Sequence, residues 1–238
     1  MNYFFLTGDS SGIGSALAQI ILQDESNILF GLSRRSREEK ERFHPLQLDL
    51  IDQAQVDKFH FPDIKDADKI ILVNNAGMLG PVKPLFEQNN KEIEQVYNLN
   101  TIAVAKLIAK FIQKYEDEEL LIINISSGAA NNAIQGWSTY CSSKSALDML
   151  TSVLIEDLKF RNINNVQVYS VSPGVIDTPM QGAIRNSEKE NFALHGQFFD
   201  LKTNNELVNP KTASELIYKI FSEPQFFGDR FINLRNHY

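Results

Sequence analysis

Short apolar runs alternate with longer amphipathic segments along the whole chain, and this alternation restricts the fold more than any other feature of the sequence. Most of the runs are apolar throughout rather than at every second position, which is typical of strands covered on both faces. We therefore predict strands at 3–6, 28–32, 45–48, 69–73, 120–125, 166–171 and 230–234.

Helical patterns lie between these runs, at 12–24, 36–42, 52–59, 89–115, 138–161 and 211–222. Strand–helix alternation predicts a parallel sheet, and right-handed crossovers favour a doubly wound one. The expected fold is α/β, a Rossmann-type sheet of about seven strands with helices on both faces. Since chains divide into domains mostly beyond about 250–300 residues, we expect a single domain at 1–238.

Two regions have features that the alternation of strands and helices does not explain. The stretch at about 175–209 is polar and too long for an ordinary connection, so we expect a substrate lid; a solvated excursion is the alternative. The helical segments at 89–115 and 138–161 carry apolar residues on more than one face. Their second faces are buried either between subunits or under the chain's own C-terminal segment.

Composition excludes several kinds of partner. With 23 basic and 30 acidic residues the net charge is −7, which does not suit binding to nucleic acid. No apolar run approaches the roughly 20 residues of a membrane span, and residues 3–6 are too few for the core of a signal peptide. The single cysteine, Cys141, suits a reducing compartment. We expect a cytoplasmic protein with no nucleic-acid, membrane or metal partner.

The segment Thr-Gly-Asp-Ser-Ser-Gly-Ile-Gly at 7–14 follows the first strand and opens the first helix. Gly8 permits a tight turn, Gly12 the close approach of a phosphate, and Gly14 the packing of helix on sheet. Backbone N–H groups and the positive helix end then face a pyrophosphate. The spacing differs from G-x-G-x-x-G, so a generic Gly/Ser turn is the alternative. The loop residues expected to contact the cofactor are Gly8, Ser10, Ser11, Gly12, Ile13 and Gly14.

The second strand ends in Leu32-Ser33-Arg34-Arg35, about 20 residues beyond the glycines, where an NAD-type site places a carboxylate for the ribose 2′-hydroxyl. Two guanidinium groups stand there instead. Arginine forms planar, charge-assisted hydrogen bonds that suit a 2′-phosphate. Arginines on a solvated loop are the alternative, but this offset favours NADP(H) as cofactor, bound by Arg34 and Arg35.

Further motifs follow in order along the chain. They are Asp49-Leu50 after the third strand, Asn74-Asn75-Ala76-Gly77 after the fourth, Asn98 in the long helix, Ser127 after the fifth strand, Tyr140-x-x-x-Lys144, and Pro173-Gly174 followed by Thr178. Together with the glycine loop they resemble the short-chain dehydrogenases/reductases, from Thr7 to about Leu234. The resemblance implies an NADP-dependent oxidoreductase that acts on a CH–OH/C=O pair of a small molecule.

The candidate catalytic residues are Ser127, Tyr140, Lys144 and Asn98. Tyr140 and Lys144 are four residues apart and share one helix face, although such pairs abound on ordinary helices. A tyrosine pKa of about 10 is too high for acid–base work at neutral pH, so we expect the ammonium to lower it. Ser127 would bind the substrate carbonyl while Tyr140 supplies the proton. The resemblance implies that Lys144 also holds the nicotinamide ribose, and that Asn98 bends its helix and anchors a water joining Lys144 to solvent.

The resemblance also implies the remaining cofactor contacts. Asp49, beside Leu50, would bind the adenine amino group, and the loop after the fourth strand would pass beneath the adenosine ribose. The loop after the sixth strand would meet the nicotinamide. The residues of these two loops are Asn75, Ala76 and Gly77, and Pro173, Gly174, Val175 and Thr178.

Within the family, the segments at 136–141 and 177–181 are similar to those of the sepiapterin reductases and of the benzil reductases that form (S)-benzoin. Both activities reduce a carbonyl in a vicinal dicarbonyl unit beside a flat ring system. Trp137 and Met180, with Phe192 and Phe198 of the lid, are expected to form an apolar slot for that ring. Packing of the lid is the alternative interpretation.

One departure bears on the substrate. The sepiapterin reductases carry an aspartate near the C-terminal strand that anchors the pterin, whereas the matching position here is Ile232 or Asn233, and Asp229 lies several residues earlier. This difference favours a benzil-like diketone over sepiapterin. A 3-oxoacyl-type reductase and, in another class, a non-catalytic NADP(H)-sensing or scaffold protein are the alternatives. We expect a homodimer, with a tetramer as the alternative.

Overall fold

Seven parallel strands form one sheet in the computed structural model, which describes residues 1–35 and 37–238. The strands are β1 (Asn2–Thr7), β2 (Asn27–Ser33), β3 (Phe43–Gln47), β4 (Lys69–Asn74), β5 (Leu120–Ile125), β6 (Val166–Ser172) and β7 (Phe231–Asn233). Their order across the sheet is β3-β2-β1-β4-β5-β6-β7, and every neighbouring pair is parallel. All seven expected strands are confirmed, each within two residues of its expected ends.

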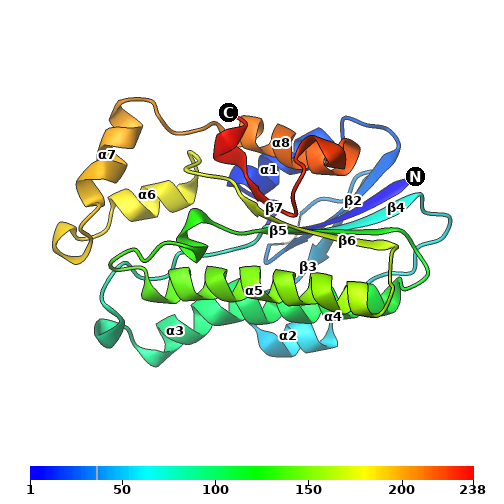
Figure 1. Ribbon diagram of the computed structural model, residues 1–238, viewed down its shortest axis with the longest axis horizontal. Helices are drawn as coiled ribbons and strands as arrows, with labels where there is room; N and C mark the ends of the chain where they lie inside the picture. The colour runs from blue at the N-terminus through cyan, green and yellow to red at the C-terminus, as the bar shows by residue number, and fades with distance from the viewer. Residues whose placement is uncertain (36) are drawn as a thin grey trace.

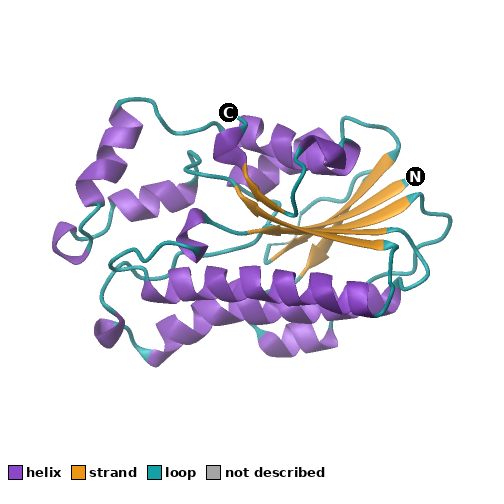
Figure 2. Ribbon diagram, in the orientation of Figure 1, coloured by secondary structure: helices purple, strands orange, loops and turns teal. Residues whose placement is uncertain are grey.

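Helices cover both faces of the sheet (Figure 1 and Figure 2). One face carries α1 (Gly12–Ile21) and α8 (Pro210–Ser222), and the other carries α2 (Gln53–Lys58), α4 (Ala103–Lys114) and α5 (Ser138–Phe160). Successive strand residues point to opposite faces, so Phe4 packs with Leu17 and Ile217 whereas Phe5 packs with Phe111. The doubly wound α/β architecture is therefore confirmed.

The expected helix at 36–42 is wrong over the residues that the structure describes there. Residues 37–42 contain no helix, and Lys40 instead forms a short antiparallel bridge with Phe43. All six of these residues are charged, Arg-Glu-Glu-Lys-Glu-Arg. A short helix is marginal without an apolar face to bury. The segment therefore stays non-helical and pairs with Phe43 through Lys40. Residue 36 lies outside the described residues.

The expected long helix at 89–115 is divided into three parts. A capping box between Asn89 and Glu92 starts α3 (Asn90–Tyr97), five residues of π-helix follow at Asn98–Ile102, and α4 continues from Ala103. In the π-helical turn the N–H of Ala103 donates to the carbonyl of Asn98, five residues back. Such turns are rare and concentrate at functional sites.

The expected lid contains two helices, α6 (Pro179–Arg185) and α7 (His195–Thr203). Figure 1 shows both helices beyond the end of the sheet, next to the start of α5. The Trp137 and Phe192 rings stack at 5.3 Å, and Phe198 lies 5.5 Å from Trp137. The Gln135 amide also bonds the lid backbone, donating to Asn191 and accepting from Ala193. The segment that carries α6 and α7 is therefore ordered and packed, and its action as a substrate lid stays a prediction.

The outer face of α5 carries exposed apolar side chains. Met149 is 64% exposed, Val153 50% and Phe160 84%. The C-terminal segment packs with α1 on the opposite side of the sheet, so it does not cover them. Of the two explanations for these apolar faces, burial under the chain's own C-terminus is thus excluded for α5. Within the described residues, none of the helices has the combination of length and apolar composition that crossing a bilayer requires.

Candidate active site

The carboxyl ends of the strands meet at one edge of the sheet, where the strand order reverses between β1 and β4. Ligands of open α/β sheets bind at such a switch point. A cavity of about 730 Å³ opens at this edge. Of the expected site residues it is lined by Gly8, Ser10, Ser11, Gly12, Ile13, Arg34, Asp49, Leu50, Asn75, Ala76, Gly77, Ser127, Tyr140, Lys144, Pro173, Gly174, Thr178 and Met180.

The glycines of the loop between β1 and α1 stand where an added side chain would crowd neighbouring atoms. A Cβ on Gly14 would lie 2.1 Å from the carbonyl oxygen of Gly8, so the helix packs against the loop only with glycine there. Gly12 has φ +52°, and a Cβ on it would lie 3.0 Å from Cγ2 of Thr178. Thr178 precedes α6 and its side chain makes no capping bond to that helix.

A hydrogen-bonded clamp joins this loop to the loop after β4. The Thr7 hydroxyl accepts from the backbone N–H groups of Asn75 and Ala76 at 3.0 and 2.9 Å. The Asn75 amide donates back to the carbonyls of Thr7 and Gly8 at 2.9 and 3.1 Å. The two loops therefore hold a fixed distance from each other on either side of the cavity.

The basic residues after β2 differ from one another in position. Arg34 lines the cavity, whereas Arg35 is exposed and is not among the described residues that line it. Arg37, which sequence reasoning missed, pairs with Asp9 of the glycine loop, and its guanidinium lies 4.7 Å from the Phe43 ring centre. The Asp9 carboxylate is buried. A carboxylate next to the glycines was the available signal, because a buried charge needs a partner.

Ser127, Tyr140 and Lys144 converge on the cavity from two elements. Ser127 follows β5, and Tyr140 and Lys144 share one face of α5. Lys144 is 4% exposed, and its Nζ donates to the Ile125 carbonyl oxygen at 2.8 Å. This Nζ lies 6.0 Å from the centre of the Tyr140 ring. Sequence spacing and the parallel sheet thus bring the three residues together as expected.

Burial dominates the electrostatics of the two titrating groups. It raises the pKa of the Tyr140 hydroxyl, and the hydrogen bond with Ser127 lowers that pKa only in part. The expected lowering of this pKa by the Lys144 ammonium is therefore wrong for this arrangement, because burial sets the direction and the lowering comes from Ser127. Burial also lowers the pKa of Lys144 to about 8, against the opposing charge of Asp148.

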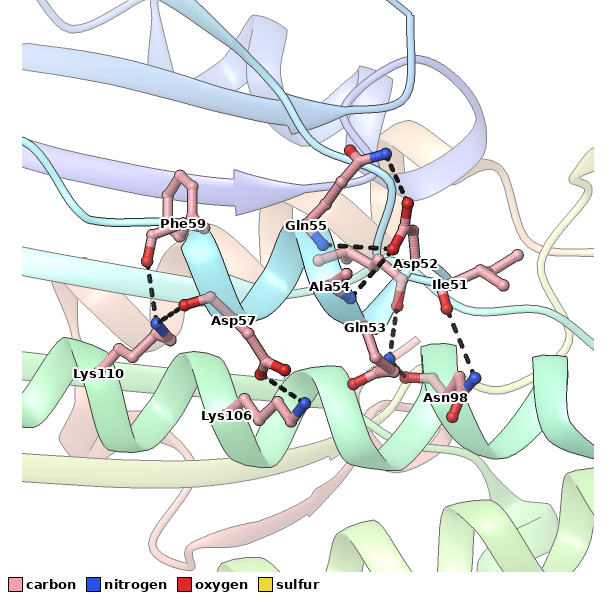
Figure 3. Close-up of polar contacts among 11 residues, drawn as sticks. Ile51, Asp52, Gln53, Ala54, Gln55, Asp57, Phe59, Asn98, Lys106 and Lys110 are labelled. Carbon is pink, nitrogen blue, oxygen red and sulfur yellow. Dashed lines mark hydrogen bonds and ion pairs between the residues drawn. The ribbon is translucent and has the colours of Figure 1, made fainter.

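Asn98 does not face these residues. Its amide nitrogen lies 3.5 Å from the Ile51 carbonyl oxygen, and its own carbonyl accepts from Gln53 at 3.3 Å (Figure 3). Figure 3 also shows Lys106 and Lys110 of α4 bonded to the α2 segment. Asn98 thus lies in the contact between the α2 segment and the π-helical turn.

Asn100, two residues later in the π-helical turn, occupies the position expected of Asn98. It is fully buried, accepts from the Met78 N–H at 2.9 Å, and donates to the Met78 carbonyl and the Ser143 hydroxyl at 2.9 and 3.0 Å. A Cβ on Gly77 would lie 3.5 Å from both Asn100 Oδ1 and Lys144 Nζ. Two asparagines in the segment Asn98-Leu99-Asn100 left the choice open, and the π-helical turn decides it.

The expected apolar slot is only partly present. Met180 lines the cavity, but Trp137 is not among the described residues that do. Trp137 is 6% exposed and packs with Phe192 and Phe198, which is the lid packing that was the alternative interpretation. Val175 packs at the edge of the same cluster. Apolar residues that line the cavity and that sequence reasoning missed include Met78, Leu79, Pro81, Leu99 and Ile176.

The C-terminal strand brings no carboxylate to this cavity from the residues compared with the pterin anchor. Ile232 is buried in the core, Asn233 accepts from the Arg235 N–H, and Asp229 accepts from the N–H groups of Arg230 and Phe231. Glu92 does line the cavity, but its carboxylate pairs with Lys83 at 2.9 Å and completes the capping box of α3.

The cavity fits a dinucleotide on three structural grounds. Gly8 and Gly12 of the glycine loop line the cavity without a side chain, as the close approach of a phosphate to the backbone requires. Arg34 supplies a positive charge beside it, as a 2′-phosphate requires. Lys144 and Thr178 also line the cavity, and Thr178, from the loop that follows β6, lies beside Gly12.

Comparison with known proteins gives one consistent result. The model of the family described as "short chain dehydrogenase" matches residues 2–189. A benzil reductase ((S)-benzoin forming) of Bacillus cereus is 30% identical, with 95% of this chain and 96% of the relative covered. A sepiapterin reductase of Bos taurus is 28% identical, with 93% and 90% covered. The crystal structure of YIR035C, a short chain dehydrogenase/reductase from Saccharomyces cerevisiae, has a TM-score of 0.81 at 23% identity and covers 92% of this chain and 90% of its own.

The buried lysine makes a testable contribution to stability. With a pKa of about 8 in the folded chain and 10.5 as its ordinary value, Lys144 releases its proton earlier when folded. The free energy of unfolding therefore rises with pH between these values. We expect urea denaturation to show that the wild type gains roughly 2–3 kcal/mol relative to Lys144→Met between pH 7 and pH 10.5. A difference that does not change with pH would contradict a desolvated Lys144.

Proposed function

Because the chain belongs to the short-chain dehydrogenase family, we propose that it is an NADPH-dependent carbonyl reductase that reduces one carbonyl of an aromatic vicinal diketone. The observation that carries this proposal is the convergence of Ser127, Tyr140 and Lys144 on the cavity that the glycine loop borders. A sensor or scaffold protein would have no use for all three side chains together. The similarity to a benzil reductase over nearly the whole chain supports the substrate class.

The residues divide the reaction into separate roles. NADPH, when bound, supplies a hydride to the carbonyl carbon. The Tyr140 O–H bond breaks and its proton goes to the carbonyl oxygen, while the Ser127 hydroxyl hydrogen-bonds that oxygen. Two electrons and two hydrogens are thus added across one C=O bond, and a diketone becomes a hydroxyketone. Lys144, which lines the cavity, would hold the nicotinamide ribose.

The direction of the Tyr140 pKa suits reduction rather than oxidation. Because burial raises this pKa, the hydroxyl keeps its proton at neutral pH and is available as a donor. Lys144, with a pKa of about 8, is close enough to neutrality to exchange a proton and restore the tyrosine after turnover. Asn100 would fix the backbone around Gly77 and Met78 beside this pair.

A diketone is favoured over sepiapterin on two grounds. None of Asp229, Ile232 and Asn233 brings a carboxylate to the cavity, so the pterin anchor is missing from that strand. The apolar residues around the cavity suit aryl groups instead. A neighbouring carbonyl withdraws electrons and eases hydride addition, so reduction should stop at the hydroxyketone. Residues 1–238 would act as one NADP(H)-binding domain, with the lid at about 175–209 closing the substrate end.

The proposed proton donor is tested with Tyr140→Phe. We expect kcat for benzil reduction with NADPH to fall at least ~10²-fold, because a general acid is lost, while NADPH binding measured by fluorescence persists. The matched control is Tyr218→Phe, at a half-buried tyrosine whose hydroxyl accepts a hydrogen bond from Asn27 on the α1/α8 side. Near-normal turnover by the Tyr140→Phe variant would contradict the assignment, and sepiapterin turnover above that of benzil would reverse the substrate ranking.

The proposed preference for NADPH over NADH is tested by substitution of Arg34, at the end of β2. Arg34→Ala should raise KM for NADPH about 10–100-fold, the loss of one charge-assisted hydrogen bond, and leave KM for NADH nearly unchanged. Arg35→Ala is the control, since Arg35 does not line the cavity. A native preference for NADH would contradict the proposal.

The exposed face of α5 extends the proposal to a homodimer. Met149, Val153 and Phe160 lie along this helix, and Ile102 is exposed at the adjoining π-helical turn. Apolar side chains gathered this way are typical of subunit contacts. We expect light scattering at micromolar concentration to give twice 27.0 kDa, or four times if a tetramer forms, and Val153→Lys to give the monomer. A wild-type monomer would contradict it.

A further inference from the structure

A buried ion pair beside the glycine loop has no part in the proposed reaction. Asp9 stands between Gly8 and Ser10, which both line the cavity, and the Asp9 side chain is 0% exposed. Arg37 pairs with Oδ2 of this carboxylate and also donates to the Asp9 carbonyl oxygen at 3.3 Å. The other carboxylate oxygen, Oδ1, has no hydrogen-bond partner within the described part of the chain. The compensation of this buried charge therefore depends on Arg37.

Strand β2 makes room for the Asp9 carboxylate. A Cβ on Gly31, within β2, would lie 2.4 Å from Asp9 Oδ2 and 2.7 Å from the Phe43 ring, so the carboxylate fills space that only glycine leaves open. The Arg37 guanidinium lies 4.7 Å from the centre of the same Phe43 ring. The Arg37 side chain is 39% exposed whereas that of Asp9 is 0% exposed, so the guanidinium lies on the solvent side of the pair.

The position of this carboxylate relates it to the cofactor. The Gly8 N–H donates to the Leu32 carbonyl oxygen at 2.9 Å, so the glycine loop is bonded to β2 two residues before Arg34, which lines the cavity. An NAD-type site places a carboxylate at the end of this strand, where it binds the ribose 2′-hydroxyl. Here a carboxylate reaches the same strand from the glycine loop, and an arginine covers it. Without that arginine, the negative charge would oppose a 2′-phosphate.

We infer that Arg37 determines the choice of NADPH over NADH by masking the charge of Asp9. The inference rests on the proposed function and deepens it. Arg37 is not among the described residues that line the cavity, so it acts through Asp9 and is a positioning residue rather than a ligand of the cofactor. An unmasked carboxylate weakens the binding of NADPH more than that of NADH, because NADPH carries the additional phosphate.

The test compares the dissociation constants of NADPH and NADH, measured by fluorescence titration at pH 8, where a carboxylate in contact with water is ionised. Arg37→Ala opens Asp9 to water, and we expect the preference for NADPH to fall about tenfold, the order expected of one added unit charge. Asp9→Asn/Arg37→Ala removes both charges and should return the preference to within about threefold of wild type. Arg42→Ala is the matched control, because Arg42 bonds the carbonyls of Leu22, Asp24 and Asn27 rather than the glycine loop.

The outcomes separate this inference from the function on which it rests. An unchanged preference in folded Arg37→Ala would overturn the masking role, and so would a double variant that loses as much as Arg37→Ala, since Arg37 would then bind the phosphate itself. A wild type that binds NADH more tightly than NADPH would overturn the proposed cofactor, and the inference with it. Thermal melting shows which variants fold. If Arg37→Ala does not, Asp9→Asn decides the question: its preference for NADPH should rise several-fold, and an unchanged or lower preference would contradict the inference.

Discussion

The active site depends on the hydrogen bonds of one buried amide. Asn100 joins the loop after β4 to α5, through the backbone of Met78 on one side and the hydroxyl of Ser143 on the other. Ser143 precedes Lys144, so the same amide fixes the cavity floor at Gly77 and the helix that carries Tyr140 and Lys144. A fully buried carboxamide with its partners satisfied permits one arrangement, because any displacement leaves a polar atom unpaired. The π-helical turn is the local distortion that brings Asn100 to this point.

Burial then sets the chemistry of the groups that Asn100 positions. Lys144 is nearly inaccessible, and its pKa falls to about 8 at a cost in stability at neutral pH. The pKa of Tyr140 moves in the opposite direction for the same reason, since desolvation disfavours whichever form is charged. The two pKa values are thereby separated, and the Lys144 ammonium becomes the stronger acid of the pair. In the proposed reaction, a Tyr140 oxygen that has given up its proton can therefore regain one from Lys144.

The sequence predicts the parts of the fold that follow from periodicity and chain direction. Seven apolar runs became seven parallel strands, and the direction of those strands placed Ser127, Tyr140 and Lys144 at one edge. It does not predict which of two asparagines faces the site, because an α-helical register cannot anticipate a π-helical turn. Nor does it separate Arg34 from Arg35, or a cavity-lining aromatic from one that packs a lid, as with Trp137. The sign of the Tyr140 shift also depends on burial, which is a property of tertiary structure.

Isotope labelling measures most directly whether a hydride passes from the cofactor to one carbonyl of a diketone in this cavity. Benzil would be reduced with NADPH carrying deuterium at one or the other of the two C4 positions, and the benzoin analysed by mass spectrometry and NMR. If the hydride passes directly from C4 to the carbonyl carbon, one of the two labels appears quantitatively at the carbinol carbon, with no deuterium lost to water and the hydroxyl proton drawn from solvent. Unlabelled benzoin from both cofactors, or deuterium exchanged into water, would contradict it.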